Sequence, residues 1–438
     1  MARKVFISIL GTGFYKKCKY ISGDFCSSNT RFAQQAVLEH TNAKEWSDTD
    51  TGIFLLTADA RAKNWEISER ENSRKEKESY TGLKNILNQL QYPFFCQDIS
   101  IPDGKTEEEI WEIFSCIYKL LEEGDELYID LTHSFRYLPM LLLVLSNYAK
   151  FLKKAQIKTL SYGNYEARDT ESNKAPIIDL LPISALQDWT FAAANYLKNG
   201  NADNLVELTQ TTIKPILKAC KGANPQAKET ASFAKQLEET SNDFQTCRGV
   251  NIYHSTHISA LKKSLKTMQS TFIQPLNPLI NQIEQMFSPF DDSPNIANGF
   301  AAAKWCNQHG LYQQAVTILQ ENITSLFCER NNISIDDEAQ REIVNKALNI
   351  VSQKLIDQEE KWRIKTAEEK EKLKEILKDR LLQNKEIFNA FSRLTEIRND
   401  INHSGMRSKQ RPLKAQQIKT KISEIVQKVE ETFLRLTD

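Results

Sequence analysis

Apolar and polar residues along roughly the first 180 positions predict strands and helices in alternation. Short apolar runs rich in β-branched residues predict strands at 4–10, 52–57, 92–98, 126–130 and 157–162. Helical spacing predicts helices at 30–40, 81–90, 107–122 and 138–152. In segment 107–122, one apolar face is expected from Ile110, Trp111, Phe114, Ile117, Tyr118 and Leu121. The alternation indicates a mostly parallel sheet with helices on both faces, a Rossmann-like α/β fold.

From Ser184 to the end, the periodicity is helical and almost no strand signal remains. The expected helices are 186–198, 203–220, 225–246, 258–287, 296–308, 311–329, 337–380, 384–399 and 414–436. Pro182 is a plausible domain boundary, since proline punctuates local structure. We therefore predict an α/β domain at 1–183 and an all-α region at 184–438. Opposite charges at i,i+4 spacing in segment 358–380 are typical of a solvated helix face.

Composition and charge narrow the function classes. The 438 residues are enough for two or three domains. The eight cysteines are scattered without a C-x-x-C pair, which favours reduced thiols in a cytoplasmic protein. Neither a signal peptide nor an apolar run of about 18 residues is found, so no membrane contact is expected. The zero net charge argues against nonspecific coating of nucleic acid, but segment 398–421 carries seven Lys and Arg against one acid.

Two polar loops follow predicted strands, where ligands of doubly wound sheets bind. In the first, Gly11, Thr12 and Gly13 offer backbone N–H groups and a hydroxyl to a phosphate, although the third glycine of a dinucleotide fingerprint is missing. A tight turn without a ligand is an equally good interpretation. In the second, Thr132 and Ser134 precede a predicted helix, a natural anion site, and Arg136 can pair with phosphate. The alternative makes Thr132 or Ser134 a helix N-cap oriented by Asp130.

Several short motifs occur in a characteristic order. They are L-G-T-G-F-Y at 10–15, T-R-F at 30–32, G-L at 82–83, E-I-W-E-I-F at 109–114, D-L-T-H-S-F-R-Y-L-P at 130–139, Y-G-N-Y-E at 162–166 and A-P-I-I-D-L at 175–180. In these motifs the chain resembles the CARF–HEPN ribonucleases of type III CRISPR systems, in the branch marked by D-x-T-H-G. The match spans the N-terminal half. Ser134 stands where that branch usually has glycine, which bears on the size of the ligand.

The resemblance implies a cyclic oligoadenylate-sensing CARF (CRISPR-associated Rossmann-like) domain in a homodimer or higher homo-oligomer. The ring, made by the type III CRISPR effector complex, would lie across a two-fold axis, since symmetric ligands suit isologous dimers. It is favoured to have four adenylates, with six as the other possibility. The implied ligand-binding residues are Gly11, Thr12, Gly13, Phe14, Thr132, His133, Ser134 and Arg136.

A second candidate site is the polar stretch from Arg398 to His403. Histidine moves protons near neutral pH, and arginine holds a phosphate through a planar fork of donors, so the pair suits RNA cleavage without metal. Positions five apart differ by about 140° on an ideal helix and do not share a face. The site therefore needs a kink or a helix end, which Ser404 and Gly405 are expected to supply.

In the family that the chain resembles, R-x4–6-H marks the catalytic site of a helical HEPN domain. The resemblance implies cleavage of single-stranded RNA by attack of a 2′-hydroxyl on the adjacent phosphate, giving cyclic phosphate ends and needing no cofactor. His403 would transfer the proton, Arg398 would clamp the phosphate, and Asn399 and Asn402 would orient them. Two such motifs would face each other in the dimer. Segment 305–321 looks like the first conserved HEPN helix, and Glu321 is expected to contact Arg398 or to be a plain surface residue.

Other interpretations stay open. The helical region can instead recruit a partner for a ligand-binding regulator, with Arg398 and His403 idle. The CARF domain can also slowly cleave its own activator, for which the hydroxyls of Thr12, Thr132 and Ser134 are compatible. The spacing of His254 and His257 suits a metal, but no further ligand is obvious nearby, and Cys306-x2-His309 is better explained by packing.

Overall fold

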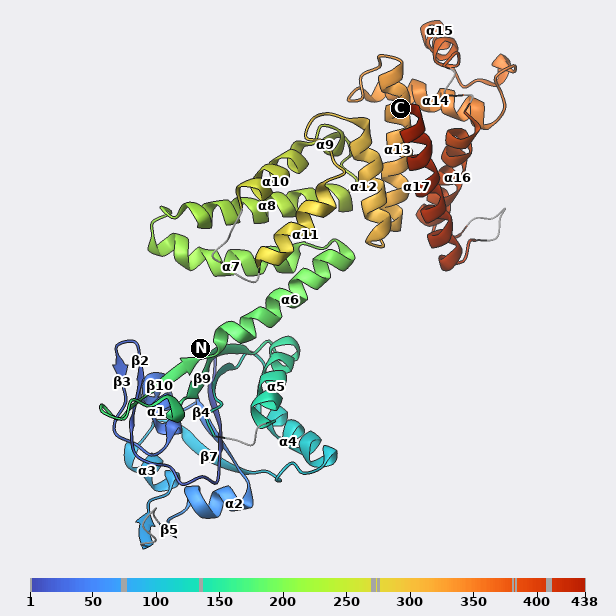
Figure 1. Cartoon of the computed structure of the whole chain (residues 1–438). Helices are drawn as coiled ribbons and strands as arrows, with labels where there is room; N and C mark the ends of the chain where they lie inside the picture. Colours follow the sequence, from blue (N-terminus) through green and yellow to red (C-terminus); the bar gives the residue numbers. More distant parts are fainter. Residues whose placement is uncertain are drawn as a thin grey trace. The chain divides into compact units, whose positions relative to one another are not determined.

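The computed structural model describes residues 2–71, 77–133, 137–268, 273, 276–379, 382, 384–406 and 412–437. The chain forms two compact units, Met1–Gln187 and Asp188–Asp438 (Figure 1). The division falls inside helix α6, Leu181–Asn199. Pro182 lies in the first turn of this helix, where a missing N–H costs no intrahelical hydrogen bond.

The first unit is built on one eight-stranded sheet, in the order β3-β2-β10-β9-β8-β1-β4-β7. Its strands are β1 Lys4–Leu10, β2 Lys19–Ser22, β3 Phe25–Cys26, β4 Thr51–Leu56, β7 Phe95–Ser100, β8 Glu126–Asp130, β9 Gln156–Gly163 and β10 Lys174–Asp179. The run from β9 to β7 is parallel, β10 is antiparallel to β9, and β3 is antiparallel to β2. The expected mostly parallel sheet is confirmed. Strands β2, β3 and β10 were not predicted, and neither was a hairpin of β5 Ser68–Glu71 and β6 Lys77–Tyr80.

Helices cover both faces of the sheet. Successive side chains of β1 and β4 point to opposite sides, so each strand contributes to two apolar clusters. Phe6, Leu10 and Phe54 pack in one apolar cluster with helices α1, Ala33–His40, and α3, Leu83–Leu90. Ile7, Ile9 and Ile53 pack in a second cluster with helices α4, Glu107–Leu120, and α5, Leu138–Leu152. The expected strands and helices of this unit are all present, three with the predicted bounds and the others with ends shifted by a few residues.

Helices α4 and α5 bury only part of their apolar surface. Ile113 and Ile117 of α4 are fully buried, whereas Trp111, expected on the same apolar face as Ile117, is 59% exposed. Its ring packs edge-on against Phe114 instead. On α5, the exposed apolar side chains are Met140, Val144, Tyr148, Phe151 and Leu152. We call Trp111 and these five residues the α4/α5 apolar face.

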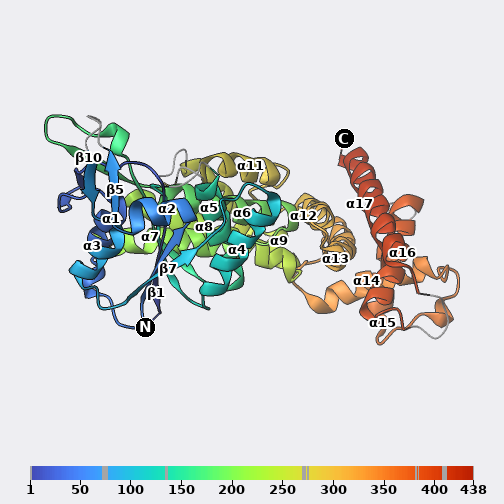
Figure 2. The ribbon, with the colours of Figure 1, turned by 90° about the horizontal axis from the view of Figure 1, so that it is seen from below.

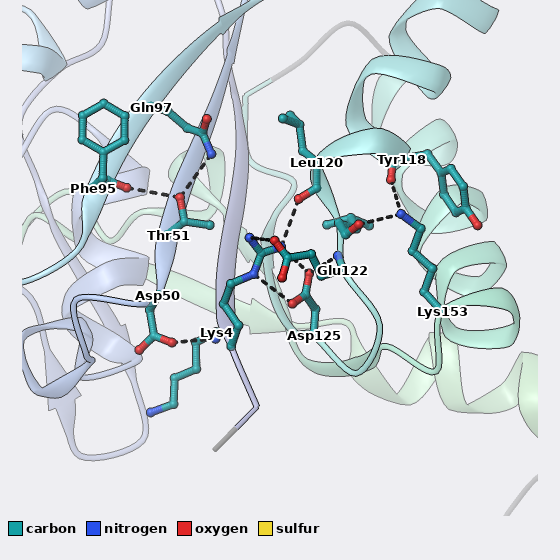
Figure 3. Close-up of polar contacts among 12 residues, drawn as sticks. Lys4, Asp50, Thr51, Phe95, Gln97, Tyr118, Leu120, Glu122, Asp125 and Lys153 are labelled. Carbon is teal, nitrogen blue, oxygen red and sulfur yellow. Dashed lines mark hydrogen bonds and ion pairs between the residues drawn. The ribbon is translucent and has the colours of Figure 1, made fainter.

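The amino-terminal edge of the sheet is closed by polar contacts (Figure 3). Arg3 donates two hydrogen bonds to the buried carboxylate of Asp125, at 3.0 and 2.7 Å. Asp50 accepts from the backbone N–H of Lys4 at 2.7 Å, and Lys153 donates to two carbonyl oxygens at the end of α4. These contacts join the starts of β1 and β8 to the helices, so the opposite, carboxyl edge is the one left for a ligand.

Among its described residues, the second unit is entirely helical (Figures 1 and 2). Its helices are α7 Asp203–Ala219, α8 Pro225–Gln245, α9 Gly249–Tyr253, α10 Thr256–Thr267, α11 Asn277–Phe287, α12 Ile296–Gln308, α13 Tyr312–Arg330, α14 Glu338–Ser352, α15 Ala367–Ile376, α16 Lys385–Asn402 and α17 Ala415–Thr437. One continuous apolar core runs through the unit and includes Trp305, Phe327 and Leu394. Helix α13 packs against α12, α14, α16 and α17 and forms the centre of the C-terminal part.

Two expected long helices are wrong. Segment 258–287 contains α10 and α11, and α11 begins with Pro278 in its first turn, a helix-start signal. Segment 337–380 contains α14, which ends at Ser352, and the separate α15. Thr366 caps α15 by accepting from the N–H of Glu369, whose carboxylate accepts from the N–H of Lys365, close to a capping box. Glu369 is buried and pairs with Lys346, so segment 358–380 is not a simple solvated face.

No helix in the part of the chain that the structure describes is both long enough and apolar enough to cross a membrane.

Candidate functional site

The two polar loops of the first unit line one pocket of about 250 Å³. Gly11, Thr12 and Gly13 follow β1, and Thr132 and His133 follow β8. These loops meet because β1 and β8 are neighbouring parallel strands whose carboxyl ends lie at the same edge. Five of the eight predicted ligand-binding residues thus share a cavity, whose remaining lining is Ile9, Leu10, Tyr15, Thr57 and Leu138.

The three other predicted residues do not line this pocket in the described structure. Phe14 belongs to the same loop, but its ring packs against Tyr80 at 5.5 Å between centroids, and the guanidinium of Arg31 lies 4.5 Å from the Tyr80 ring. Ser134 and Arg136 lie outside the described residues.

Asp130 holds the second loop in place through hydrogen bonds. Its carboxylate accepts from the hydroxyl and the N–H of Thr132, and from the hydroxyl of Ser8 at 2.7 Å. Thr132 in turn accepts from the N–H of Gly163 at 2.8 Å. Burial raises the pKa of Asp130, and the hydrogen bonds from Thr132 and Ser8 oppose this rise. The expected orienting role of Asp130 is present, but Thr132 is not the N-cap of α5, which is Tyr137 without a side-chain cap.

His133 is held in an apolar setting beside the pocket. Its imidazole stacks on the Tyr15 ring at 4.0 Å between centroids. Burial lowers the pKa of His133 to about 4, so the ring is neutral at physiological pH. Its Nε2 atom is buried without a hydrogen-bond partner among the described residues. Tyr15 also lines the pocket, although no motif in the sequence selected it.

The loop at residues 11–13 is held by a buried asparagine and has no room for a side chain at Gly11. The side-chain amide of buried Asn64 donates to the carbonyl oxygens of Gly11 and Gly13, at 2.7 and 2.9 Å. A Cβ atom at Gly11 would lie 2.7 Å from the Tyr15 hydroxyl, so this position needs glycine or a displaced tyrosine. No motif in the sequence singles out Asn64, since only the fold brings it under the loop.

In the second unit, Arg398 and His403 lie where α16 ends. Asn402 is the last helical residue, His403 is the C-cap, and Ser404 and Gly405 have positive φ. The N–H of Gly405 donates to the Asp400 carbonyl and that of Ser404 to the Ile401 carbonyl, a Schellman ending. Of the two alternatives expected from the sequence, a kink or a helix end, the structure has the helix end.

Arg398 contacts Glu321, as expected. Its Nη1 atom lies 3.3 Å from Glu321 Oε1 and 3.5 Å from Gln320 Oε1. Glu321 lies on α13, and segment 305–321 is not a single helix, because α12 ends at Gln308 and Gly310 turns the chain into α13 with a φ of 76°.

The other predicted catalytic residues surround this helix end. His403 is exposed, and no hydrogen bond joins it to Arg398 within the described structure. Asn402 accepts weakly from Gln313 at 3.5 Å, and Asn399 is half-buried. Arg407, Lys409 and Arg411 of the adjoining basic segment lie outside the described residues, whereas Lys414, Lys419 and Lys421 are exposed.

The candidate metal residues do not converge. His254 pairs with Asp336 at 3.2 Å, and His257 pairs with Asp243 at 2.7 Å, so each ring has its own carboxylate. No group of three or more His, Cys, Asp or Glu that could hold a metal occurs among the described residues. Cys306 is buried in the core and His309 stacks on Trp305 at 3.9 Å, which confirms the packing interpretation.

A known family of domains matches most of the first unit. Residues 5–167 match the family model for the CARF domain of the CRISPR system endoribonuclease Csx1. The chain is also 25% identical over 279 residues to the CRISPR-associated protein MJ1674 of Methanocaldococcus jannaschii, a match that covers 62% of this chain and 40% of that protein. The chain therefore spans well under half of the relative's length. Together these findings support a CRISPR-associated protein with a CARF domain.

Proposed function

We propose that the chain is a cyclic oligoadenylate-activated, metal-independent endoribonuclease that cleaves single-stranded RNA in the cytoplasm during type III CRISPR antiviral defence. One observation carries the proposal. The end of α16 presents an arginine and an exposed histidine, in a chain whose residues 5–167 match the CARF domain of a CRISPR endoribonuclease family. The helical C-terminal region is, on this proposal, a HEPN domain.

The activator site is the pocket between the two loops of the first unit. Glycine N–H groups and the hydroxyls of Thr12 and Thr132 suit phosphate and ribose. The pocket volume of about 250 Å³ is below the range of about 300–1,000 Å³ that ligands of drug size occupy. A ring of four nucleotides is much larger, so each copy of the chain would hold only part of it. This argues for a homodimer that shares one ring.

The α4/α5 apolar face supports the same assembly. Met140 and Phe151 are 69% and 86% exposed, and a contiguous apolar surface of this kind is typical of an interaction site. Leu138, the first residue of α5, also lines the pocket. A two-fold axis beside α5 would bring both pockets near that axis, as a symmetric ligand requires.

The proposed chemistry uses the end of α16. The 2′-oxygen attacks the adjacent phosphorus, the 5′-oxygen of the next nucleotide leaves, and a cyclic phosphate remains. The 2′-hydroxyl loses its proton and the leaving oxygen gains one, for which exposed His403 is the transfer group. Arg398 stabilises charge on the phosphate, and Asn399 and Asn402 orient the two groups. No step needs a metal ion.

The test is to incubate the purified protein with end-labelled single-stranded RNA and separate cyclic rings of three to six adenylates. We expect one ring, four adenylates by preference, to raise cleavage well above a weak basal rate, giving cyclic phosphate ends that are unchanged by EDTA. Products ending in 3′-hydroxyl with a strict need for Mg²⁺ would overturn the mechanism. Binding of a ring without RNA cleavage would instead support a regulator whose helical unit recruits a partner.

A further inference from the structure

Glu321 is shared by two arginines. Its Oε1 atom lies 3.3 Å from Nη1 of Arg398, and its Oε2 atom lies 3.1 Å from Nη2 of Arg341. The three residues come from α13, α16 and α14 respectively. One carboxylate thus touches both the proposed phosphate clamp and an arginine to which no role has been assigned.

The two arginines are held very differently. Arg341 also donates to Ser325 Oγ at 2.7 Å and to the Glu321 carbonyl oxygen at 3.3 Å, and its side chain is 18% exposed. Among the described residues, Arg398 makes only the two long contacts of Nη1, at 3.3 and 3.5 Å, and its side chain is 32% exposed. Arg341 is therefore anchored to α13, whereas Arg398 is held loosely.

We propose that Arg341 is a positioning residue that keeps Arg398 available to the RNA phosphate, an inference that rests on the proposed ribonuclease function. An arginine and a carboxylate prefer a fork of two parallel hydrogen bonds. Arg341 occupies Oε2 of Glu321, so Arg398 reaches only Oε1 and keeps its other donors for substrate. Without Arg341, the freed carboxylate closes on Arg398 as a fork and competes with the phosphate.

Methionine is a suitable replacement for Arg341, because this side chain borders a cavity of about 560 Å³ and a neutral chain can be accommodated without overpacking. Arg341→Met should lower kcat/KM for RNA cleavage about tenfold, less than the ~10²-fold or more expected when a group that touches the phosphate is removed. Arg341→Lys keeps a cation beside Oε2 and should recover most of the activity.

The decisive measurement is the double variant Glu321→Gln/Arg341→Met. A glutamine cannot form the charged fork, so the double variant should cleave several-fold faster than Arg341→Met alone. A purely structural role for Arg341 predicts the opposite, since the second substitution would only add damage. Arg330→Met is the matched control, because Arg330 lies on α13 and makes two hydrogen bonds to Asp379, at 3.1 and 3.2 Å, apart from Arg398. It should cleave RNA within about twofold of the original chain, while Tm reports folding of every variant.

The outcomes separate this inference from the proposed function. If Arg398→Ala loses cleavage but Arg341→Met does not, or if the double variant is no faster than Arg341→Met, the role of Arg341 is wrong and the ribonuclease stands. If the unaltered chain cleaves no RNA with any ring, or Arg398→Ala cleaves normally, the proposed function fails and this inference falls with it.

Discussion

At the scale of single residues, the two sites use charge in opposite ways. In the pocket of the first unit, burial keeps His133 neutral, and the Asp130 carboxylate accepts hydrogen bonds from Thr132 and Ser8. At the end of α16, Arg398 and His403 are partly or fully open to solvent. An anion bound in the pocket must rely on backbone N–H groups and hydroxyls rather than on the imidazole, whereas the α16 end offers a cation and an exposed imidazole to a phosphate.

The first residue-scale prediction concerns catalysis. His403→Ala or Arg398→Ala should lower ring-stimulated RNA cleavage by at least ~10²-fold, because one removes proton transfer and the other charge stabilisation. Ring binding, measured by calorimetry, should not change. His254→Ala is the control, since it removes a half-buried histidine paired with Asp336 elsewhere in the helical unit. Near-normal cleavage by both site variants would place the active site elsewhere.

The second residue-scale prediction concerns pH. The folded pKa of His133, about 4, is below the unfolded value of about 6.5. As pH falls, the unfolded chain therefore binds a proton that the folded chain refuses, and stability is lost from about pH 6.5 downward until about pH 4. Between pH 7 and pH 5 the loss should be about 2 kcal/mol from this residue.

Denaturant unfolding of the full chain and of His133→Gln, each at pH 7 and pH 5, measures this loss. The variant should show the smaller pH effect, and comparing the two chains cancels the opposing contribution of Asp130, whose raised pKa favours the folded state in acid. Equal pH effects in both chains would mean that His133 is protonated in the folded state at pH 5.

At the scale of helices and strands, local signals decided what the sequence could predict. Strands β1 and β8 and helix α5 were predicted with their observed bounds, because long apolar runs bordered by polar turns are strong signals. The end of α16 was also predictable from Asn402, Ser404 and Gly405. The four-residue β2 and two-residue β3 gave no such pattern, because they are too short to show a period and β2 depends on pairing with the distant β10.

The candidate sites divide in the same way. The loops and the Arg398–His403 pair follow from motifs, so their residues could be selected from the sequence. Tyr15, Asn64 and Arg341 could not, because each contacts a partner that only tertiary packing brings near it. The exposure of Trp111 could not be predicted either, because helical spacing identifies an apolar stripe but not what covers it.

The element-scale prediction tests the α4/α5 apolar face. Val144→Asp places a charge at its centre, where a second copy would have to desolvate it, and should convert the proposed dimer into a monomer. Sedimentation velocity measures the change. Lys154→Asp is the control, because it changes charge at an exposed position of the same unit, beyond the end of α5. A dimer that survives Val144→Asp would show that the copies associate through another surface.

At the scale of the whole chain, the proposed activation requires ring binding in one unit to affect RNA cleavage in another unit of different architecture. The two units divide within α6. The pocket residues and Arg398 are far apart in sequence, so a bound ring must act through a change in the dimer and in the segment around Pro182. A ligand shifts such an equilibrium only by its difference in affinity for the two states. Activation and ring binding should therefore be lost together when the pocket is altered, and basal cleavage should remain.

Thr12→Glu tests this coupling. Thr12 lines the pocket, and a carboxylate there would repel the phosphates of the ring, weakening its binding roughly 10²-fold and abolishing activation. Thr49→Glu adds the same charge at an exposed position just before β4, at the amino-terminal edge of the sheet, and should be activated normally. RNA cleavage with and without cyclic tetra-adenylate, beside direct measurement of ring binding, separates the two steps. If the unaltered chain binds the ring and its cleavage does not rise, gating is wrong, and a regulator that recruits a partner through its helical unit becomes the better account of the same fold.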